Sequence, residues 1–244
     1  MTIQKEITIG EVVAQNFKAA QVFEQFGLDF CCGGKKSIDA ACSDKGLDPD
    51  TVLNELSKLN GGAVKGFDYD SWDLDFLADY IVHNHHSYVT RSLPNILAHS
   101  QKVASVHGTN HPEVLRIADL FSNIKDDLES HMQKEEKMLF PYIKKIVAIK
   151  KNHLEMNYPP FGNILNPITV MENEHEAAGI QLSEINILSN NYTPPEDACT
   201  TFNVLYKELK EFEDDLHIHV HLENNILFTK AIELERSLTN TISL

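Results

Sequence analysis

The sequence has few cysteines and no long apolar run. Four cysteines in 244 residues are too few for a disulfide framework. No apolar run approaches the roughly 18 residues that a membrane span needs. The start, MTIQKEITIGEVV, shows no cationic stretch followed by an apolar one, as a secretory signal would. These absences predict a cytoplasmic protein with no membrane partner.

Basic residues are scarce, and histidine is missing from one part of the chain. The 21 lysines and arginines face 36 aspartates and glutamates, for a net charge of −15. Because such a chain repels polyanions, nucleic acid is not an expected partner. All 12 histidines lie after residue 82. This asymmetry indicates two domains of different chemistry.

Residues 1–59 predict a small helical N-terminal domain. Apolar residues recur at helical spacing from Val12 to Phe26. Ser37 is a candidate N-cap, and Asp48-Pro49 suits the start of another helix. Residues 60–70, NGGAVKGFDYD, contain three glycines and little periodicity. We interpret this stretch as a linker.

Residues 71–244 predict an all-α, antiparallel up-down four-helix bundle. Four long amphipathic segments are joined by short connections, as such a bundle requires. No segment alternates in the manner of a strand. The expected helices cover residues 72–98, interrupted or kinked at Pro94, then 112–150, 167–189 and 196–236.

One 15-residue pattern occurs twice in this bundle. Residues 126–140 read DDLESHMQKEEKMLF and residues 214–228 read DDLHIHVHLENNILF. The repeat pairs His131 with Glu135 and His219 with Glu223. Residues four apart lie on one face of a helix, so each imidazole and carboxylate can converge on one ion.

Helical spacing places both repeated pairs on apolar faces. An isolated His-x-x-x-Glu is usually a polar pair at the surface. Here the shared faces are apolar, and a buried charge there is costly unless a metal compensates it. The face-sharing residues are Ile124, Leu128, Met138 and Leu139 for the first pair, and Phe212, Leu216, Ile226 and Leu227 for the second.

A second pair at the same spacing, His217 and His221, has a polar face. It shares that face with Lys210, Glu213, Asp214 and Asn224. We therefore predict that His217 and His221 are surface histidines that bind no metal.

Each half of the bundle also has a histidine upstream. His86 precedes His131 by 45 residues, and His175 precedes His219 by 44. His175 lies on an apolar stripe, whereas the periodicity around His86 leaves His85 as an alternative. His83, one turn earlier, could support His86.

Four histidines and two glutamates form a nitrogen and carboxylate ligand set. Such a set suits iron, zinc or manganese, and two glutamates between two metals suit a bridged di-iron centre. A ferritin-like site would need Glu-x-x-His on two helices, and only Glu172 with His175 fits. The His-Glu-x-x-His of zinc proteases is absent.

The order His, His-x-x-x-Glu, His, His-x-x-x-Glu resembles a hemerythrin-like domain. With four histidines and two glutamates, the chain is similar to the RIC (repair of iron centres) di-iron proteins of bacteria, which carry an N-terminal ScdA-type Cys-Cys domain. The resemblance covers nearly the whole chain. Its motifs are LDFCCGGK near residue 30, SHMQKEEKMLFP at 130–141, MENEHEAAG at 171–179 and HLENNILF at 221–228.

The resemblance implies a ligand set and a function. It favours His86 over His85, because the family ligand lies eight residues before the proline that is here Pro94. The implied ligands are His86, His131, Glu135, His175, His219 and Glu223.

The implied cofactor is a pair of non-haem iron ions joined by an oxo or hydroxo bridge. The implied function is repair of iron–sulfur clusters damaged by nitrosative or oxidative stress, by iron donation or by nitric oxide chemistry. Damaged iron–sulfur proteins would be the partners, with nitric oxide or oxygen as the small ligand. The alternative is a di-iron sensor or carrier of nitric oxide or oxygen without repair activity.

The sequence Cys31-Cys32-Gly33-Gly34-Lys35-Lys36 is a second candidate site. Adjacent cysteines form a strained disulfide, so a structural bridge is not expected. The lysines could lower a thiol pKa. Two interpretations stay open: a tight glycine turn with half-buried thiols, or thiols that act in redox chemistry, transient metal binding or contact with a client. Cys42 and Cys199 are predicted to be packing residues.

Overall fold

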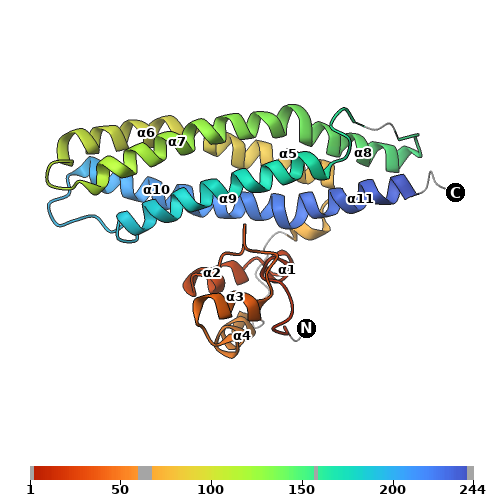
Figure 1. Ribbon diagram of the computed structural model, residues 1–244, viewed down its shortest axis with the longest axis horizontal. Helices are drawn as coiled ribbons and strands as arrows, with labels where there is room; N and C mark the ends of the chain where they lie inside the picture. The colour runs from red at the N-terminus through yellow and green to blue at the C-terminus, as the bar shows by residue number, and fades with distance from the viewer. Residues whose placement is uncertain (1–2, 60–67, 157–158, 241–244) are drawn as a thin grey trace. The chain divides into compact units, whose positions relative to one another are not determined.

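The computed structural model describes residues 3–59, 68–156 and 159–240, and most of them are helical (Figure 1). They contain no strand beyond an isolated bridge between Thr8 and Ser37. The prediction of an all-α protein is confirmed. The chain forms two compact units: residues 1–77, 146–156 and 217–244 in the first, and residues 78–145 and 157–216 in the second. Most of the predicted linker, residues 60–67, lies outside the described residues.

The second unit contains the long helices of a bundle. Helix α6 packs against α7, and α7 packs against α9 (Figure 1). Phe121 and Phe212 are fully buried and meet edge to face, 5.4 Å between ring centroids. The helices of this unit are α6 (Ser87–His107), α7 (Glu113–Lys134) and α9 (Leu165–Leu188), with parts of α5 (Leu74–Ile81), α8 (Phe140–Asn152) and α10 (Thr200–His221).

The first unit joins the N-terminal helices to the end of the chain. The turn η5 (Leu222–Leu227) packs against α1, the 3-10 helix η2 (Tyr69–Ser71) and α11 (Phe228–Asn240). The N-terminal helices are α1 (Ile9–Gln15), α2 (Ala19–Gln25), α3 (Ile38–Lys45) and α4 (Pro49–Lys58).

Local capping explains why these short helices begin where they do. Ser37 accepts a hydrogen bond from the Ala40 amide at 3.2 Å, and Asp48 accepts one from the Asp50 amide at 3.1 Å. Both predicted caps are confirmed. The single helix predicted from Val12 to Phe26 is wrong, because Asn16 is extended and its side chain accepts from the Lys18 amide.

In the described part of the chain, three π-helical turns interrupt the bundle helices. They are η3 (Val82–His86), η4 (Glu135–Leu139) and η5 (Leu222–Leu227). Of the interruption or kink expected at Pro94, the interruption is wrong, since α6 continues through that residue. None of the described helices is long and apolar enough to cross a membrane.

Candidate metal centre

The π-helical turns carry three of the candidate ligands. His86 ends η3, Glu135 begins η4, and Glu223 lies within η5. A π turn holds one residue more than an α turn, and such turns are frequent at functional sites. The extra residue shifts the phase of the helix that follows. Met138, which 3.6-residue spacing places on the ligand face, is therefore 38% exposed.

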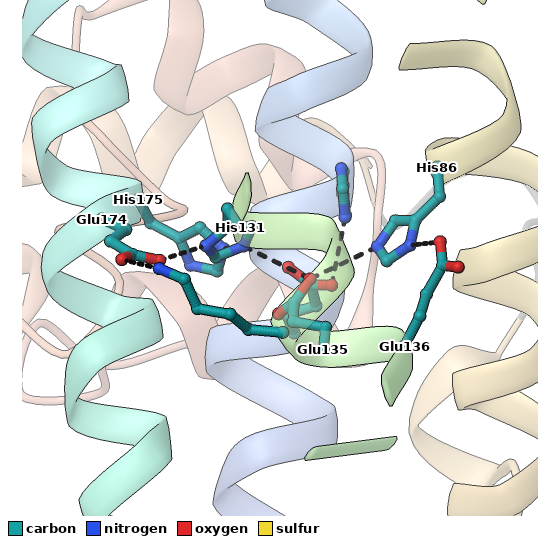
Figure 2. A network of polar contacts seen from close by, with 9 residues as sticks. His86, His131, Glu135, Glu136, Glu174 and His175 are labelled. Carbon is teal, nitrogen blue, oxygen red and sulfur yellow. Dashed lines mark hydrogen bonds and ion pairs between the residues drawn. The ribbon is translucent and has the colours of Figure 1, made fainter. Parts of the chain in front are cut away.

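Four predicted ligands of the second unit, three histidines and Glu135, form one cluster. Glu135 Oε2 lies 3.4 Å from His86 Nε2 and 3.3 Å from His131 Nε2. His175 Nε2 lies 2.9 Å from His131 Nε2. Figure 2 shows Glu135 between His131 and His86. All four side chains are buried, with Glu135 fully enclosed.

Two further carboxylates contact the histidine rings at Nδ1, the ring nitrogen that does not face Glu135. His86 Nδ1 lies 2.8 Å from Glu136 Oε1, and His131 Nδ1 lies 2.9 Å from Glu174 Oε2 (Figure 2). A protonated Nδ1 donates to each carboxylate, which leaves the Nε2 lone pair directed toward Glu135. The sequence reasoning missed Glu136 and Glu174, whose signal was their position directly beside Glu135 and His175.

Glu174 is held in its ionised form. Partial burial opposes ionisation, but hydrogen bonds from Lys134 and His131 bring the pKa of Glu174 below its ordinary value. A charged carboxylate accepts the Nδ1 proton strongly, so it fixes the tautomer of His131.

The first unit holds the second repeated pair. His219 Nε2 lies 3.1 Å from Glu223 Oε1, and the two side chains are 1% and 0% exposed. The apolar face predicted for this pair is confirmed, since Phe212, Leu216, Ile226 and Leu227 are all buried.

These residues fit a metal ion of the kind that prefers nitrogen and oxygen ligands. Two ring nitrogens bound at about 2.1 Å from one ion at a right angle lie about 3.0 Å apart. The separation of His131 Nε2 and His175 Nε2 is 2.9 Å. A fully buried carboxylate such as Glu135 also needs a compensating positive charge.

The alternatives His85 and His83 differ from His86 in their surroundings. His85 is buried, and its Nδ1 lies 3.1 Å from Asp215 Oδ1. His83 is exposed, and the Nδ1 atom of His86 contacts Glu136. The structure thus places His86 beside Glu135, and it does not place His85 there.

The prediction of two surface histidines is wrong for His221. Its side chain is 0% exposed, and its ring lies 5.7 Å from that of Phe30 and 6.4 Å from that of Phe17. Burial lowers the pKa of His221 to about 4, so the ring is neutral at neutral pH. Phe17 and Phe30, from the segments that follow α1 and α2 in the same unit, cover this face, which the periodicity of one helix cannot reveal. His217 is half-buried against Phe30.

The paired cysteines form a tight turn around Asp29. Cys31 and Cys32 are free thiols with sulfur atoms 3.9 Å apart. Asp29 Oδ1 accepts from the amides of Cys31 and Cys32 and from the Cys31 thiol at 3.0 Å, and Oδ2 accepts from the Gly33 amide.

The prediction that neighbouring lysines lower the pKa of a thiol is wrong for Cys31. A hydrogen bond with Cys32, burial, and the negative charge of Asp29 all raise the pKa of the Cys31 thiol. Lys36 instead pairs with Asp44 at 2.7 Å. The other cysteines differ: Cys42 is buried as predicted, but Cys199 is exposed, with its sulfur 3.2 Å from His107 Nε2.

Two known domain families match consecutive parts of the chain. ScdA_N, described as a domain of unknown function (DUF542), matches residues 5–60. The hemerythrin HHE cation binding domain matches residues 77–231, a range that includes all six candidate ligands.

Bacterial proteins match nearly the whole chain. The iron-sulfur cluster repair protein YtfE of Dickeya chrysanthemi (strain Ech1591) is 35% identical over 231 residues, which cover 95% of this chain and 99% of that protein. The YtfE protein of Escherichia coli O81 (strain ED1a) is 34% identical over 224 residues, or 92% and 96% of the two chains. This chain belongs to the family of the iron–sulfur cluster repair proteins YtfE, with a ScdA_N domain and a hemerythrin HHE cation binding domain.

Proposed function

We propose that this protein repairs iron–sulfur clusters damaged by nitrosative or oxidative stress, with damaged iron–sulfur proteins as its partners. One structural observation carries the proposal. His86, His131 and His175 gather with the fully buried Glu135 in one cluster. The match to a cation-binding domain supports a metal in this cluster, and the relatives' name as iron-sulfur cluster repair proteins supports the reaction.

The proposed ligands are the six residues of the doubled pattern and its upstream histidines. About two iron ions are expected per chain, from the ligand count and the bridging role of carboxylates in di-iron sites. Glu135 and Glu223 would bridge the ions. The histidines would be His86, His131, His175 and His219.

The number of proposed protein ligands is compatible with a repair function. Six protein side chains do not saturate two ions, so the pair can supply either exchangeable iron or open positions for nitric oxide. The chain's own part is to hold the neutral imidazoles in place. Glu136 and Glu174 do this by accepting the Nδ1 protons.

The test is recovery of a [4Fe–4S] dehydratase that nitric oxide has inactivated. Wild type should reactivate it, and Glu135→Ala should lose both its iron and this activity. Glu129→Ala is the matched control, because Glu129 is an exposed glutamate of α7. Equal reactivation by wild type and an iron-free Glu135→Ala would contradict the proposal. A stable nitric oxide or oxygen adduct without any reactivation would instead favour a sensor or carrier.

A further inference from the structure

The turn at Asp29, Cys31 and Cys32 brings together three metal-ligating side chains far from any histidine in the sequence. One oxygen and two sulfur atoms all lie within 4.8 Å of one another. The metal centre described above makes no use of them. We name residues 29–34 the thiol turn.

The sulfur spacing matches two ligands of one ion. Two sulfurs bound at about 2.3 Å to a tetrahedral ion lie about 3.8 Å apart. The separation of the Cys31 and Cys32 sulfurs is 3.9 Å. A disulfide would require about 2.05 Å, so the two thiols are set for a shared ion better than for a bond to each other.

Asp29 is positioned as the third ligand. A carboxylate has about four lone-pair sites. Oδ2 accepts from the Gly33 amide, and Oδ1 accepts from the Cys31 and Cys32 amides and, at 3.0 Å, from the Cys31 thiol. The Cys31 thiol proton occupies this contact. If a cation replaces this proton, the Cys31 sulfur and the Asp29 oxygen are both directed at the cation, because both already face the position of the proton.

The charge of the turn favours a cation over free thiolates. Two thiolates beside a carboxylate repel one another, because three negative charges then lie within 4.8 Å of one another. A bound cation removes that penalty and releases protons. Cys31 is buried, whereas Cys32 is half-buried and Asp29 is exposed. The site is therefore open to solvent on one side, so that an ion can enter and leave.

We propose that Asp29, Cys31 and Cys32 form a second metal site, for a thiophilic divalent cation of the iron(II) and zinc(II) class. Binding forms two metal–sulfur bonds and releases the two thiol protons to solvent, so it needs no oxidant or reductant. The proposal does not depend on repair activity, because the site is defined by its own ligands.

Cobalt(II) titration of the reduced full-length protein tests the proposal. A thiolate-to-cobalt charge-transfer band in the near ultraviolet reports sulfur ligation, which the histidine and glutamate ligands cannot produce. We expect this band in wild type, with release of about two protons per ion. Cys31→Ser with Cys32→Ser should abolish it, and Asp29→Asn should weaken cobalt affinity about tenfold.

Three variants make the result specific. Cys42→Ser and Cys199→Ser each remove one of the other thiols and should leave the band unchanged. Glu135→Ala should also keep the band. Loss of metal from the histidine and glutamate centre is thereby distinguished from loss of metal from the thiol turn. Circular dichroism checks that each variant is folded. No band in reduced wild type would overturn the proposal, as would a band that survives the double cysteine change or disappears in Cys199→Ser.

Discussion

At the scale of single residues, the orientation of the ligand histidines is the sharpest feature. Glu136 holds His86 through Nδ1 at 2.8 Å, although its own side chain is exposed. We predict that Glu136→Ala weakens iron affinity about 10-fold to 100-fold, because the ring loses the acceptor that fixes its tautomer. Competition with a chelator measures the affinity.

Glu129→Ala is the control for Glu136→Ala. Glu129 is exposed on α7 and pairs with Lys125 at 2.9 Å, away from any candidate ligand. Its replacement should leave iron affinity unchanged. Glu136→Gln should fall between wild type and Glu136→Ala, since the amide oxygen can still accept the Nδ1 proton. Equal affinity in all four proteins would remove Glu136 from the site.

We predict that His221 matters for stability and not as a ligand. Its buried ring fills the space beside Phe30, and its Nδ1 lies 3.1 Å from Asn225 Nδ2. We predict that His221→Ala lowers the free energy of unfolding by about 2 kcal/mol, through the cavity and the lost hydrogen bond. His217→Ala, at a half-buried ring, should cost less. Denaturant unfolding compares them, and equal costs would contradict the assignment.

At the scale of elements, η5 is held by the N-terminal helices of its own unit. Asn225 Nδ2 donates to the carbonyls of Phe30 at 3.1 Å and Cys31 at 3.2 Å. Gly10 and Gly34 allow this approach, because a Cβ atom at either would lie 2.6 or 2.5 Å from Asn225 Oδ1. The turn that carries Glu223 is therefore held by hydrogen bonds from the Asn225 side chain to the backbone of the thiol turn.

We predict that Gly34→Ala loosens this attachment. The added methyl would also lie 2.6 Å from the Phe30 carbonyl oxygen, which is backbone and cannot rotate away. A loss of about 1–3 kcal/mol in unfolding free energy is expected, with faster amide exchange in η5. Gly27→Ala is the control, because Gly27 has φ +64° and no atom within 4 Å of an added Cβ. It should lose stability through local strain and leave exchange in η5 unchanged.

The loop between α6 and α7 carries a pH-dependent contact. His111 Nε2 lies 3.0 Å from Asp197 Oδ1, and this hydrogen bond raises the pKa of His111. The contribution to stability is full below about pH 6.5, the unfolded pKa, and is lost as pH rises through the raised folded value. We predict that His111→Gln and Asp197→Asn flatten this loss in thermal unfolding between about pH 6 and pH 8. Replacing the exposed His153 by Gln should not flatten it.

The sequence was informative wherever structure depends on neighbours along the chain. Ser37 and Asp48 cap their helices through residues two or three positions away, so their patterns predicted the helix starts. The π-helical turns were beyond reach, because 3.6-residue spacing assumes a regular helix. Met138 was therefore placed on the wrong face. His221 was misplaced for another reason, since Phe17 and Phe30, which cover its ring, lie about 200 residues earlier in the chain.

At the scale of the whole molecule, domain organisation stays a prediction. The sequence predicts domains at residues 1–59 and 71–244, and the two family matches, at 5–60 and 77–231, support that division. The compact units cross it, because η5 and α11 pack in one unit with the N-terminal helices. Removing residues 1–67 distinguishes the predicted domains from the compact units. The deletion removes one predicted domain completely, whereas it removes only part of the first compact unit.

We predict that a chain beginning at Asp68 folds, retains bound iron and is less stable than the full protein. All six proposed ligands are kept, so iron content should stay near that of wild type. The face of η5 around His221 and Asn225 loses the cover of Phe30 and the hydrogen bonds to the thiol turn. The newly exposed apolar surface should lower the unfolding midpoint and increase binding of a hydrophobic dye. Iron quantitation and thermal unfolding compare the shortened chain with the full protein. An insoluble or iron-free product would show that the N-terminal helices complete the bundle's fold, because no proposed ligand would have been removed.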